Sequence, residues 1–167
     1  MAKRSAFPWL LVGLWACGGG PPPKTGPTAA DPRMPPSDTV ARVRQRLGDS
    51  AQSCGEAIQG IDHDGCRAQP VLDCVHAAFQ AHRPAQGTFM YATAEGDPVR
   101  VDYFVVLSGG HARLVVVSDR SADPVGDKGV DEHECSEVRW GEHAERPGCQ
   151  TLLPERCSLR SRAPRRH

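Results

Sequence analysis

The sequence has no excess charge of either sign. Its 167 residues carry 20 Lys or Arg and 20 Asp or Glu, so the formal net charge is zero. A protein that binds nucleic acid is expected to carry a basic excess, because that excess pairs with phosphates. The even balance therefore indicates no nucleic-acid partner.

Long apolar runs are also missing. The run from Ala6 to Ala16 is too short to cross a bilayer as a permanent helix, which needs about 20 apolar residues. Lys3 and Arg4 stand directly before it. A short positive segment followed by a brief apolar run is typical of an export signal.

The familiar catalytic motifs are absent as well. The sequence has no Gly-x-Ser-x-Gly elbow, no phosphate-cradling glycine loop and no His-Glu-x-x-His helix. Asp73 and His76 lie one helical turn apart and could form an acid-base pair, so an envelope hydrolase stays an alternative. We expect no enzymatic activity and no cofactor.

Metal sites are weighed and not expected. The segments His63-Asp64 and His133-x-Cys135 invite a zinc interpretation, but the sequence lacks a close Cys pair or two His one turn apart. Asp62-x-Asp64-Gly65 resembles the start of a calcium loop, yet the position where that loop needs Glu is Val71.

The segment Leu14-Trp15-Ala16-Cys17 resembles the lipobox of bacterial lipoproteins, which places an apolar residue three before the cysteine and a small one directly before it. The resemblance implies a signal peptide over 1–16 and a lipid chain, such as palmitate, on Cys17. Gly18 follows Cys17, where Asp would imply retention in the inner membrane, so the resemblance implies a cell-envelope protein on the outer membrane. An ordinary secretory signal and an uncleaved anchor are the alternatives.

Composition divides the remainder into three parts. Residues 17–36 are rich in Gly and Pro and predict a tether with almost nothing to bury. Residues 37–159 are expected to form one domain, and the Arg-rich segment 160–167 is expected to be a disordered basic tail.

Cysteine gives a firm structural expectation. If Cys17 carries lipid, an even number remains, which in an exported chain predicts three disulfides. Three of these cysteines precede the expected strands and three follow them, so complete pairing requires an odd number of bridges between the two groups. The disulfide candidates are Cys54, Cys66, Cys74, Cys135, Cys149 and Cys157.

Hydrophobic spacing predicts the elements. A helix is expected from Ser37 or Asp38 to Gly48, a weaker one over 51–59 and a clear one over 70–83. Period-2 alternation over 88–119 predicts three strands, and 134–140 a short fourth. The fold class is α+β: two or three short helices on a three- to four-stranded antiparallel meander, stapled by disulfides.

The expected strands carry a testable register. Closing the turn at Gly109-Gly110 places Val105 opposite Leu114 and Arg100 opposite Asp119. Closing the first turn symmetrically places Met90 beside Tyr103, and Phe89 opposite Phe104.

One face of this sheet is unusually apolar. It would be covered by the chain itself or by a protein or small-ligand partner. We expect a non-enzymatic binding module, bound to the membrane through Cys17, that uses this face. The possible binding face comprises Phe89, Phe104, Val106, Val115 and Val117.

Overall fold

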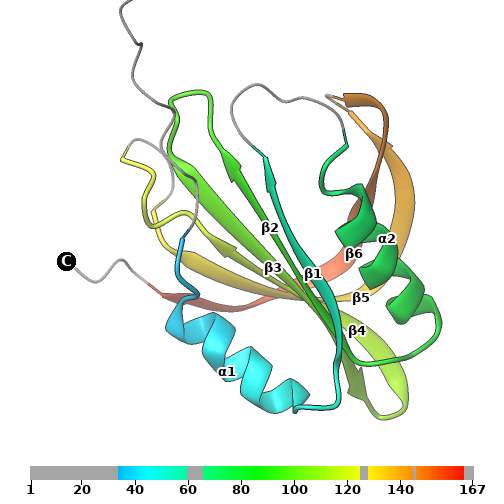
Figure 1. Cartoon of the computed structure of the whole chain (residues 1–167). Coiled ribbons are helices and arrows are strands. Elements are labelled where there is room, and N and C mark those ends of the chain that lie inside the picture. Colours follow the sequence, from blue (N-terminus) through cyan, green and yellow to red (C-terminus); the bar gives the residue numbers. More distant parts are fainter. Residues whose placement is uncertain (1–33, 60–65, 125–127, 145, 164–167) are drawn as a thin grey trace, which may run out of the picture.

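A computed structural model describes residues 34–59, 66–124, 128–144 and 146–163. They form one mixed sheet with a helix on each face (Figure 1). The six strands lie side by side in chain order, and only the first pair is parallel. The strands are β1 (Gln52–Gln59), β2 (Ala85–Ala92), β3 (Pro98–Ser108), β4 (His111–Asp119), β5 (Val130–His143) and β6 (Arg146–Ala163).

The prediction of a small antiparallel meander is therefore wrong. The sheet is larger and mixed, and two helices, not three, stand among the described residues: α1 (Asp38–Leu47) and α2 (Gln69–Gln80). The short strand expected over 134–140 is the centre of a much longer one, β5. Most of the remaining segment, expected to be irregular, is β6.

Helix α1 forms as predicted. Ser37 is its N-cap and accepts a hydrogen bond from Val40 N, and Gly48 follows its last residue with a φ of 78°. Val40 and Val43 are fully buried against Phe104, Val115 and other residues of one sheet face. The capping signals and the apolar spacing agree with each other, so local sequence defines this helix.

The segment expected as a second helix is β1 instead. Gly55 has a φ of 82°, which a helix does not allow, and the pairing of β1 with β2 is irregular between Ser53 and Glu56. The spacing of Cys54, Ala57 and Ile58 fits a helix, but pairing with β2 overrides that weak local preference.

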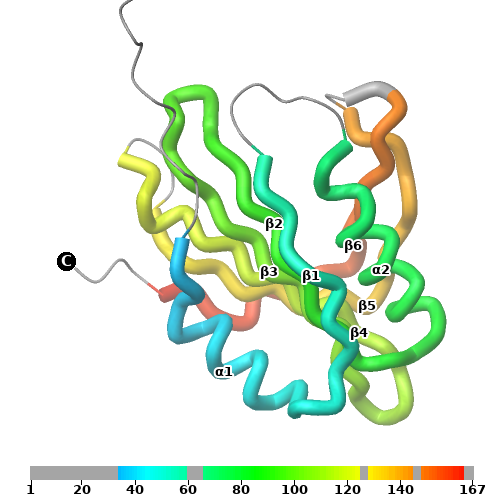
Figure 2. The backbone as a smooth tube through the Cα atoms, in the orientation of Figure 1, coloured from blue at the N-terminus to red at the C-terminus, as the bar shows by residue number. Residues whose placement is uncertain are grey.

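Helix α2 lies between β1 and β2 in the chain and covers the other sheet face, as the backbone in Figure 2 shows. Parallel strands need such a crossover, because a short turn cannot reverse the chain twice. Val71, Leu72, Val75 and Ala78 of α2 are buried against this face. Neighbouring residues of β3 and β4 point alternately to α1 and α2.

The register of the second hairpin is confirmed. Val105 pairs with Leu114, Leu107 with Ala112 and Arg100 with Asp119. Two glycines with positive φ close this hairpin, Gly109 and Gly110.

The register of the first hairpin was predicted wrongly. Tyr103 pairs with Gly87, and Met90 pairs with Arg100. Thr93 closes a longer loop, because its backbone N–H donates to Asp97 O and its hydroxyl accepts from Asp97 N. The shift by an odd number of residues moves each β2 side chain to the face opposite the predicted one.

All six candidate cysteines are paired, as predicted. Cys54–Cys74 joins β1 to α2 and Cys135–Cys157 joins β5 to β6. Cys66–Cys149 is the single bridge between the two groups. The parity requirement of an odd number of such bridges is therefore confirmed.

Candidate functional site

A pocket of about 270 Å³ opens at the N-terminal end of α2. We call it the α2 pocket. Its walls come from the ends of β1, β2 and β3, the first turn of α2, and the end of the β5–β6 hairpin, which lies beside α2 in Figure 1. Its described lining is Gln59, Cys66, Ala68, Gln69, Leu72, Phe89, Tyr91, Val101, Tyr103, His143, Cys149, Gln150 and Thr151.

One wall of the α2 pocket is aromatic. Phe89 and Tyr91 stand two residues apart on β2 and so share a face of the sheet, with ring centroids 5.4 Å apart and planes inclined by 26°. Tyr103 of β3 lies on the same face. Its ladder neighbour is Gly87, which has no side chain to fill the space beside it.

Gly87 allows α2 to approach the sheet closely. A Cβ atom at this position would lie 2.7 Å from Val71 Cγ1 and 3.0 Å from Val75 Cγ2. Such distances are too short for carbon atoms, so any larger residue would push α2 outward. The depth of the pocket under α2 depends on this contact.

Amide side chains form the polar part of the α2 pocket. Gln59 at the end of β1 is only 1% exposed. Gln69 Oε1 accepts a hydrogen bond of 2.8 Å from Gln150 N, and Gln69 Nε2 donates to Asp73 Oδ1 at 3.0 Å. Gln69 therefore holds the β5–β6 hairpin against the start of α2.

The Cys66–Cys149 disulfide is also part of this wall. Both cysteines line the pocket, and the bond joins the chain just before α2 to β6. The covalent link and the Gln69 hydrogen bond join the same two parts of the molecule. The pocket is thus bounded by segments that cannot separate freely.

Tyr103 stays protonated at any ordinary pH. Burial raises its pKa to about 12, and the nearby Tyr91 adds to the shift. The phenol can therefore donate a hydrogen bond as well as accept one. No Asp, Glu, Lys or Arg belongs to the described lining of the α2 pocket.

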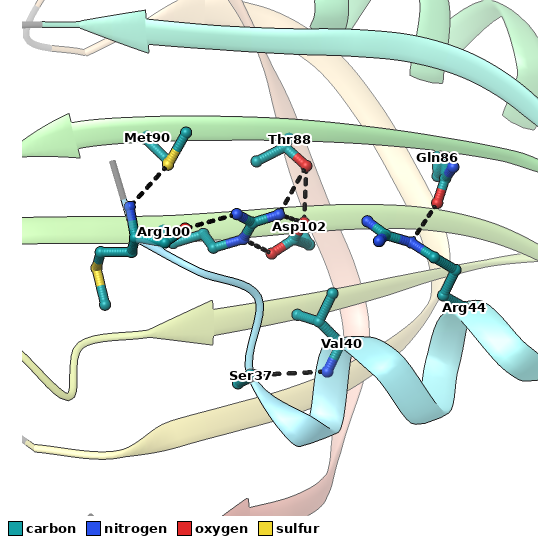
Figure 3. A network of polar contacts seen from close by, with 9 residues as sticks. Ser37, Val40, Arg44, Gln86, Thr88, Met90, Arg100 and Asp102 are labelled. Carbon is teal, nitrogen blue, oxygen red and sulfur yellow. Dashed lines mark hydrogen bonds and ion pairs between the residues drawn. The ribbon is translucent and has the colours of Figure 1, made fainter. Parts of the chain in front are cut away.

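A second polar cluster lies buried on the other face of the sheet, under the start of α1 (Figure 3). Arg100 donates from Nε to Asp102 Oδ2 at 2.6 Å and from Nη1 to Met34 O at 2.8 Å. Thr88 Oγ1 donates to Asp102 Oδ1 at 2.7 Å. We call Thr88, Arg100 and Asp102 the Arg100 network; because its hydrogen bonds are made within the chain, it is structural.

Asp73 and His76, the predicted acid-base alternative, make separate contacts. Asp73 accepts the hydrogen bond from Gln69, whereas the His76 ring stacks on Trp140 at 4.7 Å with a 6° angle between planes. Neither lines the α2 pocket. The structure does not bring the two together with a third polar group.

The structure separates the residues of the predicted binding face. Phe104, Val106, Val115 and Val117 pack with α1, and Phe104 is 1% exposed. Phe89 lies on the opposite face, in the α2 pocket. The chain itself covers the larger part of this apolar surface, because the register of the first hairpin differs from the predicted one.

The predicted anchor at Cys17 and the tether over 17–36 lie almost wholly outside the described residues, as do Asp62, His63 and Asp64. Within the described ranges, no three His, Cys, Asp or Glu side chains gather so as to hold a metal ion. Neither described helix is long and apolar enough to span a membrane.

The expected basic tail begins later than predicted. Arg160 and Arg162 belong to β6, where they pair with Glu134 and Asp131 of β5. The residues beyond Ala163 lie outside the described part.

Sequence reasoning missed most of the α2 pocket. The available signal was the alternation of Phe89 with Tyr91 and of Val101 with Tyr103, two pairs that a correct register places together. Gln59 and Gln150 carried no signal, because one was assigned to a helix and the other to an irregular segment.

Comparison with known proteins adds no relative: no family model, no curated protein and no solved structure matches the chain.

Proposed function

We propose that this chain is a lipid-anchored protein of the bacterial cell envelope, on the outer membrane where there is one, and that its domain binds a small uncharged ligand in the α2 pocket. The observation that carries the ligand site is the pocket itself. It combines an aromatic wall, buried amide groups and a lining without a charged carboxylate, ammonium or guanidinium group.

The chemistry of this lining favours a neutral ligand. A charged ligand would leave water for a site that offers no opposite charge, and such transfer costs several kcal/mol. An uncharged molecule avoids this cost and gains from contact with Phe89, Tyr91 and Tyr103. Concave sites with apolar walls and a few polar groups are the usual form of small-molecule sites.

Two features support the location. The lipobox-like segment Leu14-Trp15-Ala16-Cys17 supplies an anchor, and the three disulfides suit the oxidising space outside the cytoplasm. A disulfide in the wall of the α2 pocket also suits a binding site that works in that space.

A thermal-shift experiment tests the ligand site. The full-length lipidated protein, in a detergent without a sugar headgroup, is heated with a panel of neutral monosaccharides, neutral aromatics and small amides. A ligand at ten times its Kd should add about 1.4 kcal/mol of stability, which raises Tm by about 5 °C for a domain of this size.

Two variants locate the effect. Thr151→Trp should fill the α2 pocket and abolish the shift, because Thr151 lines it. Glu95→Trp places the same ring on the exposed loop between β2 and β3 and should leave the shift unchanged. The proposal fails if no neutral compound raises Tm, or if Thr151→Trp responds like the parent.

The anchor is tested separately by labelling cells with a fatty acid. The parent chain should take up label and sediment with membranes, and Cys17→Ala should do neither. Each buried CH₂ of an acyl chain contributes about 0.8 kcal/mol, so loss of the lipid should release the domain. Label on the Cys17→Ala chain would contradict lipidation at this residue.

A further inference from the structure

The α2 pocket limits the size of its ligand. Its volume of about 270 Å³ equals that of roughly nine water molecules at ~30 Å³ each. A ligand that fills it has on the order of a dozen non-hydrogen atoms. This is the size of one six-membered ring with its substituents, and it excludes a long peptide or an acyl chain as the buried group.

The two kinds of wall limit its shape. Phe89, Tyr91 and Tyr103 gather on the sheet and offer flat, weakly polar surfaces. Gln69 and Gln150 stand at the meeting of α2 and the β5–β6 hairpin. A ligand that suits both has an apolar face for the rings and a polar rim for the amides and hydroxyls.

The polar groups limit its hydrogen bonding. A Gln amide has both donors and an acceptor, and the hydroxyls of Thr151 and Tyr91 donate as well as accept. Groups of this kind match hydroxyl substituents, which also do both. A ligand edge of fixed donors and acceptors would gain no particular advantage here.

On these grounds, and resting on the proposed ligand site, we infer that the α2 pocket binds a single pyranose ring of a neutral saccharide. The C–H face of the ring lies on the aromatic wall, and its hydroxyls meet Gln59, Gln150 and Thr151. A pyranose has this combination of an apolar face, a rim of hydroxyls and no charge, in a unit of the required size.

Isothermal titration calorimetry tests the inference on the full-length lipidated protein in a detergent without a sugar headgroup. The probes are glucose and N-acetylglucosamine as neutral sugars, glucose 6-phosphate as a charged sugar, and phenol and indole as neutral aromatics. At least one neutral sugar should bind, and the phosphorylated sugar should bind at least about tenfold more weakly because its charge has no partner in the pocket.

Variants of Tyr91 assign the sugar to the aromatic wall. Tyr91→Ala removes a ring that the sugar would contact and should weaken binding about tenfold. Tyr91→Phe keeps the ring and should bind within about threefold of the parent. Circular dichroism spectra and Tm of both variants show that the fold is kept.

The outcomes separate this inference from the proposed function. Binding of phenol or indole without either neutral sugar would overturn the saccharide inference and leave the neutral-ligand site standing. Equal binding of glucose and glucose 6-phosphate, or sugar binding that Tyr91→Ala does not weaken, would also overturn it. If no probe binds here and none in the larger neutral panel raises Tm, the proposed site itself fails.

Discussion

Arg100 Nε lies 2.6 Å from Oδ2 of Asp102, two residues further along β3, although the neighbour of Arg100 across the ladder is Asp119. Both side chains of this ion pair are buried, at 5% and 1% exposure. The hydrogen bond with Asp102 raises the pKa of Arg100, while burial opposes the shift. The pair also carries a hydrogen bond to Met34 O, which holds the end of the tether on the domain.

Breaking this pair on one side should be strongly destabilising. Asp102→Ala leaves the buried Arg100 charge without its carboxylate and should cost about 3–5 kcal/mol. The double variant Arg100→Met with Asp102→Ala removes both charges and should recover a large part of that loss. Urea unfolding measures both, and a double variant less stable than Asp102→Ala would contradict this account.

Gly87→Ala should loosen α2. The new Cβ would stand 2.7 Å from Val71 Cγ1, so the helix must shift, at a cost of about 1–3 kcal/mol. Thermal unfolding measures the loss. Gly109→Asn is the control, since Asn tolerates positive φ and nothing lies within 4 Å of that Cβ position; equal losses in the two variants would argue against the packing explanation.

The disulfides should differ in their contribution to stability. Cys66–Cys149 joins residues 83 apart in sequence, and Cys135–Cys157 joins residues 22 apart. Loop-closure entropy then predicts losses of about 4.5 and about 3.4 kcal/mol when each pair is replaced by Ala. Denaturant unfolding under oxidising conditions compares the two double variants, and the reverse order would count against the entropic explanation.

Stability should fall in alkaline solution because of Tyr103. Its pKa is about 12 in the folded chain and about 10 when unfolded. Between these values only the folded state keeps the proton, so stability decreases as pH rises, by about 2–3 kcal/mol in all. Below pH 10 both states hold the proton, and this group causes no pH dependence.

Urea unfolding at pH 9 and pH 11.5 tests that window. Tyr103→Phe should lose less stability between the two pH values than the parent. Tyr91→Phe should retain most of the loss, because burial of Tyr103 is the larger cause of its shift. Equal pH dependence in the parent and Tyr103→Phe would show that other groups dominate.

Local chemistry made part of this fold predictable. Ser37 and Gly48 mark the ends of α1 because capping and positive φ depend on neighbouring residues alone. Gly109-Gly110 sets the second hairpin for the same reason, and its tight turn leaves one register between β3 and β4. The cysteine count required an odd number of bridges between the two groups, whatever the fold.

Long-range pairing decided the rest. The segment Gln52–Gln59 is a strand because β2 offers it a partner, although its apolar residues are spaced as in a helix. The longer loop closed by Thr93 moved Phe89 and Phe104 to opposite faces, so one lines a pocket while the other lies under α1. The α2 pocket exists only in three dimensions, since Gln59, Tyr103 and Gln150 are brought together by the sheet and by the Cys66–Cys149 bond. The sequence by itself determined the capped helix, one hairpin and the disulfide parity, because short-range sterics and counting are enough for these. Only the tertiary structure decided the sheet order and the candidate site, because they depend on contacts between residues far apart in the chain.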